Sequence, residues 1–347
     1  MKIIISIDSF KGCLSSTEAC QAAAEGVRQC WPDADVICIP VSDGGEGWTE
    51  AFERGQPEKW EPRVATVHDP LQRPIKAHYL QDKDIAIIEI AKVCGLTLLR
   101  PEERNPLLAS TRGVGELLLE AYNHGCRKFV VGLGGSGTSD AGIGLTEALS
   151  PTLPALQSQC HFTIATDVTN PLLGKQGAAT IFGHQKGATP AIVEELEERA
   201  RRFSEKNARL MGKDCSSAPG AGAAGGLGYA FLQFLNAERR SGAELLLETL
   251  HFKDNLRSAD LVITGEGSAD QQTLMGKLPS VILRYAKEAG VACHLVAGQV
   301  DNKADLLAAG FSSVHCINPR SLPLTIAMQP SEARKNIMLS TQRILRP

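Results

Sequence analysis

The chain has 347 residues, which is more than one compact hydrophobic core usually holds, so we expect two domains. Hydrophobic residues make up 43% of the chain and charged residues 22%, and the formal net charge is −3. This balance excludes a basic nucleic-acid-binding protein. The apolar start at residues 3–7 ends at Asp8 and is too short for a secretory signal or a membrane span. We therefore expect a cytoplasmic protein without a membrane partner.

The ten cysteines include no C-x-x-C pair, and the eight histidines show no metal-ligand spacing. This pattern predicts neither a disulfide framework nor a structural metal site. We expect reduced cysteines that pack in the interior.

The first strand is predicted at residues 2–7, which are rich in β-branched side chains. The loop Asp8-Ser9-Phe10-Lys11-Gly12 follows, and Ser15 with Glu18 has the spacing of a capping box at the start of a helix. Asp8 therefore stands at the carboxyl end of a strand, where open α/β sheets bind their ligands.

A second strand is predicted at 36–41, and it leads into another acidic, glycine-rich loop that begins with Ser42-Asp43-Gly44. Pro57 and Pro62 then mark a change in composition, which places a domain boundary near residue 60. Three strands of a meander follow, at 63–67, 75–80 and 85–90. Glu89 lies inside the last apolar run, so this buried carboxylate needs a partner, most simply an ion pair.

The most conspicuous stretch runs from Gly132 to Gly144 between a predicted strand at 129–131 and a predicted helix at 145–149. Glycines allow backbone N–H groups to converge on an anion such as phosphate, and the N-terminus of a helix also favours a bound anion. Thr138 and Asp140 stand where oxygen ligands of a phosphate-bound Mg²⁺ would be needed.

Two alternatives remain for this stretch. Gly132, Gly134 and Gly137 also fit the G-x-G-x-x-G pattern of a dinucleotide-binding unit, with Asp167 as its acid, although that acid lies further along than usual. A glycine-rich turn without any ligand is the other alternative.

Further polar loops follow later strands. A strand at 162–165 precedes Asp167 and Asn170, and Lys186 comes just before a helix that begins at Thr189 and ends at Gly212. The segment 219–228 (PGAGAAGGLG) is too rich in glycine for a strand or a stable helix, so we expect it to approach another backbone or a ligand closely.

The last hundred residues alternate strands at 261–264, 294–296 and 314–317 with helices, and the first of these strands leads into the loop Gly265-Glu266-Gly267. This alternation predicts a parallel sheet that residues 3–41 complete. The fold class is therefore α/β with two domains. Residues 1–60 and 250–347 form a discontinuous, doubly wound domain of Rossmann or flavodoxin type. Residues 61–249 form an inserted mixed α/β domain, with the active-site cleft between the two.

Carboxylates, lysines and glycines gather in the loops that follow the strands: Asp8, Lys11, Asp43, Asp140, Asp167, Lys186, Glu266 and Lys277. Carboxylates that hold Mg²⁺, lysines that offset phosphate charge and N–H nests are the recurring parts of phosphoryl transfer. The chain contains neither a G-x-x-x-x-G-K-[ST] loop nor the H-R-D and D-F-G elements of protein kinases. The pattern predicts a phosphotransferase of another fold.

Seven motifs in order resemble the bacterial glycerate kinase family and run nearly from end to end of the chain. They are Asp8-Ser9-Phe10-Lys11-Gly12, Asp43-Gly44-Gly45-Glu46-Gly47, Gly134-Gly135-Ser136, Asp167 with Asn170-Pro171-Leu172-Leu173-Gly174, Gln185-Lys186-Gly187, Pro219-Gly220-Ala221-Gly222 and Ile263-Thr264-Gly265-Glu266-Gly267. The resemblance implies ATP-dependent phosphorylation of D-glycerate to 2-phospho-D-glycerate with Mg²⁺, by a monomer or homodimer.

The site residues are hypotheses that rest on this resemblance. The catalytic group comprises Asp8, Lys11, Asp167 and Lys186, with Asp8 and Asp167 as general base and Mg²⁺ ligand in an order left open. The ATP-binding group comprises Gly134, Gly135, Ser136, Thr138, Glu266 and Asp270. The glycerate-binding group comprises Ser9, Asp43, Asn170 and Arg112, and Asp140 and Asp167 are the predicted metal ligands.

The chain departs from the family pattern at three places. Ser268-Ala269 replace an Arg-Leu pair before Asp270, residues 137–142 replace A-T-N-D-G-G, and Arg112 replaces an aromatic residue. A lost arginine removes a bidentate partner for a carboxylate or phosphate, so we hypothesise that Arg112 supplies the missing cation.

Three alternatives to a D-glycerate 2-kinase remain. One is an NAD-dependent dehydrogenase that uses the Gly132 loop. The others are a kinase for a related hydroxy acid or one that forms 3-phosphoglycerate, and a non-catalytic anion-binding protein.

Overall fold

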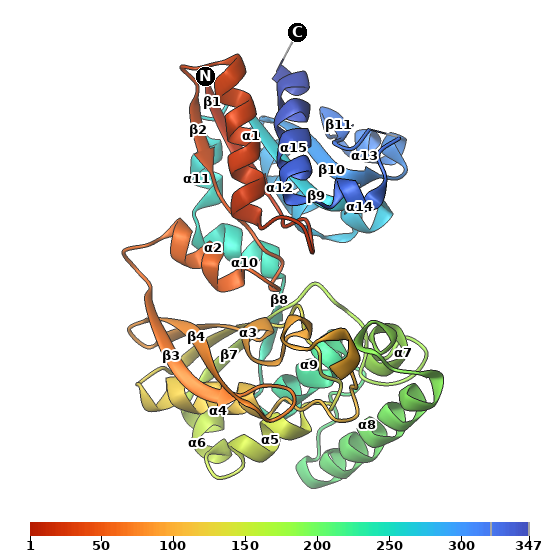
Figure 1. The fold of residues 1–347 in the computed structure, drawn as a ribbon. Helices are drawn as coiled ribbons and strands as arrows, with labels where there is room; N and C mark the ends of the chain where they lie inside the picture. Colours follow the sequence, from red (N-terminus) through yellow and green to blue (C-terminus); the bar gives the residue numbers. More distant parts are fainter. Residues whose placement is uncertain (320, 346–347) are drawn as a thin grey trace. The chain divides into compact units, whose positions relative to one another are not determined.

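The computed structural model describes residues 1–319 and 321–345 (Figure 1). The chain divides into two compact units. Unit 1 comprises Met1–Asp43, Glu50–Gln56 and Ala243–Pro347, and unit 2 comprises Gly44–Thr49 and Pro57–Gly242. The predicted domain boundaries and the predicted cleft stay predictions.

Unit 1 is built on a five-stranded sheet in the order β11-β10-β9-β1-β2, in which every neighbouring pair is parallel. Its strands are β1 (Lys2–Ile7), β2 (Asp35–Cys38), β9 (Leu261–Ala269), β10 (Ala292–Val300) and β11 (Ser313–Cys316). Counted within the unit, this order is 2-1-3-4-5, as in flavodoxin-like folds, with the switch point between β1 and β9. The predicted parallel sheet is confirmed.

Helices cover both faces of this sheet, which explains why β1 reads as a continuous apolar run. The helices α1 (Ser16–Cys30) and α15 (Pro330–Leu345) pack on each other and on strands of one face, and α12 (Leu278–Ala289) packs on β9 and β10 (Figure 1). The predicted capping box is present, since Ser15 and Glu18 bond each other's backbone N–H groups. The remaining helices that belong to or adjoin unit 1 are α2 (Trp48–Gly55), α10 (Gly242–Thr249), α11 (Phe252–Leu256), η4 (Gln271–Met275), α13 (Lys303–Ala309) and α14 (Leu324–Ala327).

Unit 2 contains a six-stranded sheet in the order β3-β4-β5-β6-β7-β8. Its strands are β3 (Glu61–His68), β4 (Pro74–Asp82), β5 (Ile85–Glu89), β6 (Lys128–Gly132), β7 (His161–Ala165) and β8 (Glu238–Arg240). The first three strands are antiparallel, which confirms the predicted meander, and the pairs from β5 to β8 are parallel. β8 was not predicted, because the short polar run Glu-Arg-Arg carries no strand pattern.

The helices of unit 2 surround this sheet. They are α3 (Ala91–Cys94), η1 (Leu96–Leu98), η2 (Pro101–Glu103), α4 (Arg112–Asn123), α5 (Ile143–Leu149), α6 (Leu153–Gln159), α7 (Ala178–Phe182), η3 (His184–Lys186), α8 (Pro190–Met211) and α9 (Ala223–Phe234). As predicted, Thr189 caps α8, which ends at the left-handed Gly212. None of the helices in the described ranges combines the length and apolar character that crossing a bilayer requires.

Two expectations about single segments are settled by the structure. Glu89 has the predicted partners: it accepts hydrogen bonds from Gly47 N, Thr49 N and Thr49 Oγ1, and Lys92 Nζ lies 3.8 Å away. Residues 265–269, which were expected in a loop, continue β9 beside β10, with Glu266 opposite Ala297. The acidic side chain therefore sits on a rigid strand.

Candidate active site

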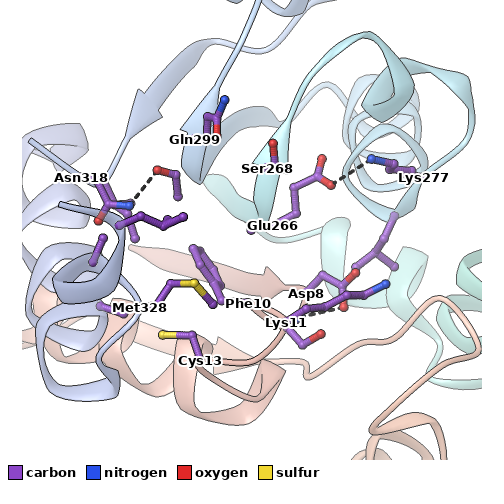
Figure 2. Close-up of a pocket in the computed structure, with 18 of the residues that line it drawn as sticks. Asp8, Phe10, Lys11, Cys13, Glu266, Ser268, Lys277, Gln299, Asn318 and Met328 are labelled. Carbon is purple, nitrogen blue, oxygen red and sulfur yellow. Dashed lines mark hydrogen bonds and ion pairs between the residues drawn. The ribbon is translucent and has the colours of Figure 1, made fainter. Parts of the chain in front are cut away.

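Unit 1 holds a cavity of about 400 Å³ where the carboxyl ends of β1, β9, β10 and β11 come together. This is the switch point of the sheet, where open α/β sheets bind ligands. Figure 2 shows Asp8, Lys11, Glu266 and Lys277 on one side of the cavity, Asn318 and Met328 on the other, and Phe10 between them. Ser9 and Asp43 also line the cavity, so five of the predicted site residues lie in one place: Asp8, Ser9, Lys11, Asp43 and Glu266.

Backbone contacts of a tight turn hold Asp8 at this position. The N–H of Asp8 donates to Gly265 O of β9 at 2.8 Å, which keeps the chain beside the neighbouring strand after β1 ends. The turn then closes through paired backbone hydrogen bonds between Phe10 and Leu14 and passes through Gly12 at φ +73°. A residue with a Cβ is strained at that φ, which explains the glycine.

Asp8 experiences an unusual electrostatic environment. Burial together with the charge of Asp43 raises its pKa to about 8, and Glu266 acts in the same direction. The N–H of Ser9 donates to Asp8 Oδ1 at 2.7 Å, and this bond and Lys11 oppose the rise. A carboxyl group with a pKa near neutrality in a cavity has the properties of a general base or a cation ligand.

Glu266 is buried and held by two neighbours. Thr273 Oγ1 donates to Glu266 Oε1 at 2.6 Å, and Lys277 Nζ lies 3.7 Å from Glu266 Oε2. Burial is the largest influence and raises the pKa of Glu266. Asp270 caps the short helix η4 by accepting from the N–H groups of Gln272 and Thr273, and Lys277 Nζ is 3.9 Å away. This contact set gives Asp270 a structural role beside the cavity, and its predicted ligand role stays a prediction.

The glycine-rich stretch in unit 2 contains backbone contacts that bear on the predicted phosphate cradle. The N–H of Gly134 donates to Gly44 O at 2.9 Å, and the N–H of Gly137 donates to Cys94 O at 2.7 Å. A Cβ at Gly134 would lie 2.3 Å from the Cα of Gly45. These two glycines are therefore needed for close backbone packing, and the predicted role of Gly134 in binding ATP phosphates stays a prediction.

The segment 219–228 shows the expected close approach to another backbone. A Cβ at Gly225 would lie 2.0 Å from Thr138 O, and one at Gly226 would lie 2.6 Å from the Cα of Ala141. Thr138 itself is fully buried beneath this contact. The structure therefore gives Thr138 a role in packing, and the predicted roles of Thr138, Gly135 and Ser136 in binding ATP stay predictions.

Lys186 lies under the same loop, with only 2% of the residue exposed. Its ammonium donates to Ser136 Oγ at 2.8 Å and to Thr138 O at 2.7 Å. Burial lowers its pKa to about 8. These two hydrogen bonds hold the loop in position, and the predicted catalytic role of Lys186 stays a prediction.

Asp140, a predicted metal ligand, is held by hydrogen bonds between two helix starts, and its metal role stays a prediction. It is 4% exposed, and its two carboxylate oxygens accept from Thr111 N, Thr111 Oγ1, Gly142 N and Gly144 N. These four donors hold the start of α5 against the start of α4. Among residues 1–319 and 321–345, no three His, Cys, Asp or Glu side chains form a group that could hold a metal ion.

The remaining predicted residues lie elsewhere in unit 2. Asp167 follows β7, and Asn170 Nδ2 donates to Gln176 O at 2.8 Å. Arg112 Nε donates to Glu116 Oε1 at 3.0 Å on its own helix, and His68 contacts the same carboxylate. Roles of Asp167, Asn170 and Arg112 in catalysis or binding stay predictions.

The sequence analysis did not predict three residues that line the cavity. They are the apolar Phe10 and Met328 and the polar Asn318. Phe10 and Met328 resemble ordinary core residues. Asn318 could have been found, because it follows directly after the predicted strand at 314–317 and so lies at the same sheet edge as Asp8.

Comparisons with known proteins agree on one family. The sequence model of the glycerate kinase family matches residues 3–154 and 150–347. A glycerate kinase of Halalkalibacterium halodurans is 36% identical, with 95% of this chain and 94% of that protein covered. A glycerate 2-kinase of Escherichia coli K12 is 38% identical, with 83% of this chain and 82% of that protein covered.

A solved structure gives the same result. A crystal structure described as a glycerate kinase 2 from Salmonella typhimurium LT2 has a TM-score of 0.80 and 35% identity, and covers 99% of this chain and 97% of that one. With matches that extend over nearly the whole sequence, the chain belongs to the glycerate kinase family and is a phosphotransferase, as the sequence predicted.

Proposed function

We propose that the protein transfers the γ-phosphoryl group of ATP to the 2-hydroxyl of D-glycerate and releases 2-phospho-D-glycerate and ADP. The observation that carries this proposal is the cluster of Asp8, Asp43 and Glu266 with Lys11 and Lys277 at the switch point of the unit 1 sheet. Phosphoryl transfer depends on positioned carboxylates and cations rather than on covalent chemistry by the protein. Among the relatives, the E. coli protein is named a glycerate 2-kinase, which favours the 2-position.

Asp8 is the proposed general base. Its raised pKa lies near neutral pH. A base with such a pKa is partly ionised and also accepts a proton readily. In this role Asp8 takes the proton of the attacking hydroxyl as the oxygen bonds to phosphorus. Lys11 and Lys277 offset the negative charge of the phosphate oxygens, and Glu266 holds Lys277 at the cavity wall.

The donor set of the cavity fits Mg²⁺. The charge of Asp43 raises the pKa of Asp8, and a hard cation that binds carboxylate oxygens would offset this repulsion. Mg²⁺ commonly takes only one or two protein carboxylates and completes its shell with water and substrate phosphates, so a group of three protein ligands is not required. When bound, the ion would neutralise phosphate charge, and Asp43 would hold it while Asp8 acts as the base.

No observation favours the dehydrogenase alternative. The glycines that suggested it are Gly132, Gly134 and Gly137. The last two are needed for backbone packing, and their N–H groups donate to Gly44 O and Cys94 O. The assay that separates the two functions supplies ATP, Mg²⁺ and D-glycerate and follows ADP release, with NADH absorbance measured in parallel. We expect ADP release and a 2-phosphoglycerate signal in the ³¹P NMR spectrum. Formation of NADH would overturn the whole proposal. Formation of 3-phosphoglycerate would overturn only the proposed position of phosphorylation.

A further inference from the structure

The cavity in unit 1 has two chemically different halves. The charged half contains the residues proposed for phosphoryl transfer, and the other half is lined mainly by apolar side chains: Phe10, Ile317, Leu324, Ala327 and Met328. Leu324 is 71% exposed and Met328 is 42% exposed, although both are large apolar residues. Exposed apolar side chains gathered around a cavity indicate a surface that a ligand covers.

The cavity is larger than glycerate alone would fill. Even at the roughly 30 Å³ that each water molecule takes in the liquid, the seven heavy atoms of glycerate would fill about 210 Å³. The cavity measures about 400 Å³, so the acceptor leaves much of it unfilled. Of the two proposed substrates, only ATP carries a flat apolar group that could cover the second half.

Asn318 adds a polar group at this apolar end (Figure 2). Its Nδ2 donates to Gly298 O at 2.8 Å, and its Oδ1 accepts from the buried Asn336 at 3.3 Å. These two bonds fix the orientation of the amide and leave one N–H and one oxygen lone pair. An amide with one donor and one acceptor matches the N6 and N7 edge of adenine.

We propose that the apolar half of this cavity binds the adenine ring of ATP and that Asn318 selects adenine over guanine. This inference rests on the proposed function for the identity of the nucleotide. The base would contact Phe10 and Met328, and the phosphates would extend toward Lys11 and Lys277 at the opposite end.

The first test places a negative charge in the apolar half. Met328→Glu should raise the Kd for ADP and the KM for ATP by roughly tenfold or more, with a smaller effect on the KM for D-glycerate. Ile326→Glu is the matched control, because Ile326 lies two residues before Met328 on α14, is 40% exposed and does not line the cavity. Equal nucleotide affinities in the two variants would overturn the inference.

The second test reads occupancy without catalysis. Cys13 lines the cavity, whereas Cys215 is a partly exposed thiol in unit 2. We expect ADP to slow iodoacetamide labelling of Cys13, measured by mass spectrometry, and to leave Cys215 unchanged. Protection of Cys13 by D-glycerate but not by ADP would contradict the inference. If ADP protects Cys13 in a protein that does not phosphorylate glycerate, the proposed function fails and the nucleotide site stands.

The third test concerns the choice of base. Asn318→Ala should reduce the ratio of kcat/KM for ATP to that for GTP by roughly fivefold or more, because the bidentate contact is lost. An Asn318→Ser variant, which keeps one donor and one acceptor, should recover part of the ratio. An unchanged ratio in both variants would remove Asn318 from base selection.

Discussion

The ammonium of Lys186 donates a hydrogen bond to Ser136 Oγ at 2.8 Å beneath the glycine-rich loop of unit 2. A second bond, to Thr138 O at 2.7 Å, holds the same loop two residues further on. The lysine is almost completely buried, so it fixes the loop from the interior. This relationship gives the lysine that follows the loop in the sequence a structural role.

Replacing Lys186 should therefore affect stability. Lys186→Met removes two hydrogen bonds and leaves Thr138 O and Ser136 Oγ without that donor, which costs about 1–3 kcal/mol of unfolding free energy. Urea denaturation measures the change, and Lys175→Met, at an exposed lysine, is the control with no expected effect. A large loss of kcat with unchanged stability would instead restore the predicted catalytic role.

Asp140 offers a parallel test of a predicted metal ligand. Asp140→Asn retains the shape but weakens acceptance from four N–H and O–H donors, so we expect a loss of about 2–4 kcal/mol in stability. The Mg²⁺ concentration that gives half-maximal activity should not change. Asp84→Asn, which alters a surface pair with Lys128, should cost less than about 1 kcal/mol. A selective increase in the Mg²⁺ requirement of Asp140→Asn would contradict the structural role.

The raised pKa of Asp8 predicts a dependence of stability on pH. The unfolded carboxyl has a pKa near 3.8 and the folded one near 8, so the folded protein binds one more proton between these values. Wild-type stability should therefore fall as pH rises from about 4 to 8, and this contribution stays lost at higher pH.

Asp8→Asn removes that titration. Without nucleotide or Mg²⁺, the variant should gain stability relative to wild type as the pH is raised from 5 to 9, in thermal unfolding followed by circular dichroism. Asp33→Asn, at an exposed carboxylate of unit 1, supplies the control. A constant difference between Asp8→Asn and wild type across this range would show that the folded pKa of Asp8 is ordinary.

Much of the unit 1 site could be predicted because its position follows from strand ends. Asp8 stands directly after a strong β-branched strand, and the parallel sheet brings its carboxyl end beside Glu266. Glu89 is a second success, since a buried carboxylate requires donors, and Thr49 and Lys92 supply them. These predictions depend on local sequence patterns of strands and on the free-energy cost of burying a carboxylate without a partner.

The glycine-rich loop shows where a sequence pattern alone is ambiguous. Glycine is required both where N–H groups converge on an anion and where two backbones approach closely, so the pattern of Gly134 and Gly137 fits both. The choice depends on segments distant in sequence, namely Gly44 and Cys94, which accept the N–H groups. Met328 was missed for a similar reason, because only the tertiary fold brings α14 to the cavity.

The most direct test of the central claim is the kcat of Asp8→Asn with ATP, Mg²⁺ and D-glycerate. The account predicts a loss of roughly 10²–10⁴-fold in kcat, with a smaller change in KM and with Cys13 still protected by ADP. Asp33→Asn should retain wild-type kcat. A kcat close to wild type in a folded, nucleotide-binding Asp8→Asn protein would contradict the assignment of the unit 1 cavity as the site of phosphoryl transfer by this base.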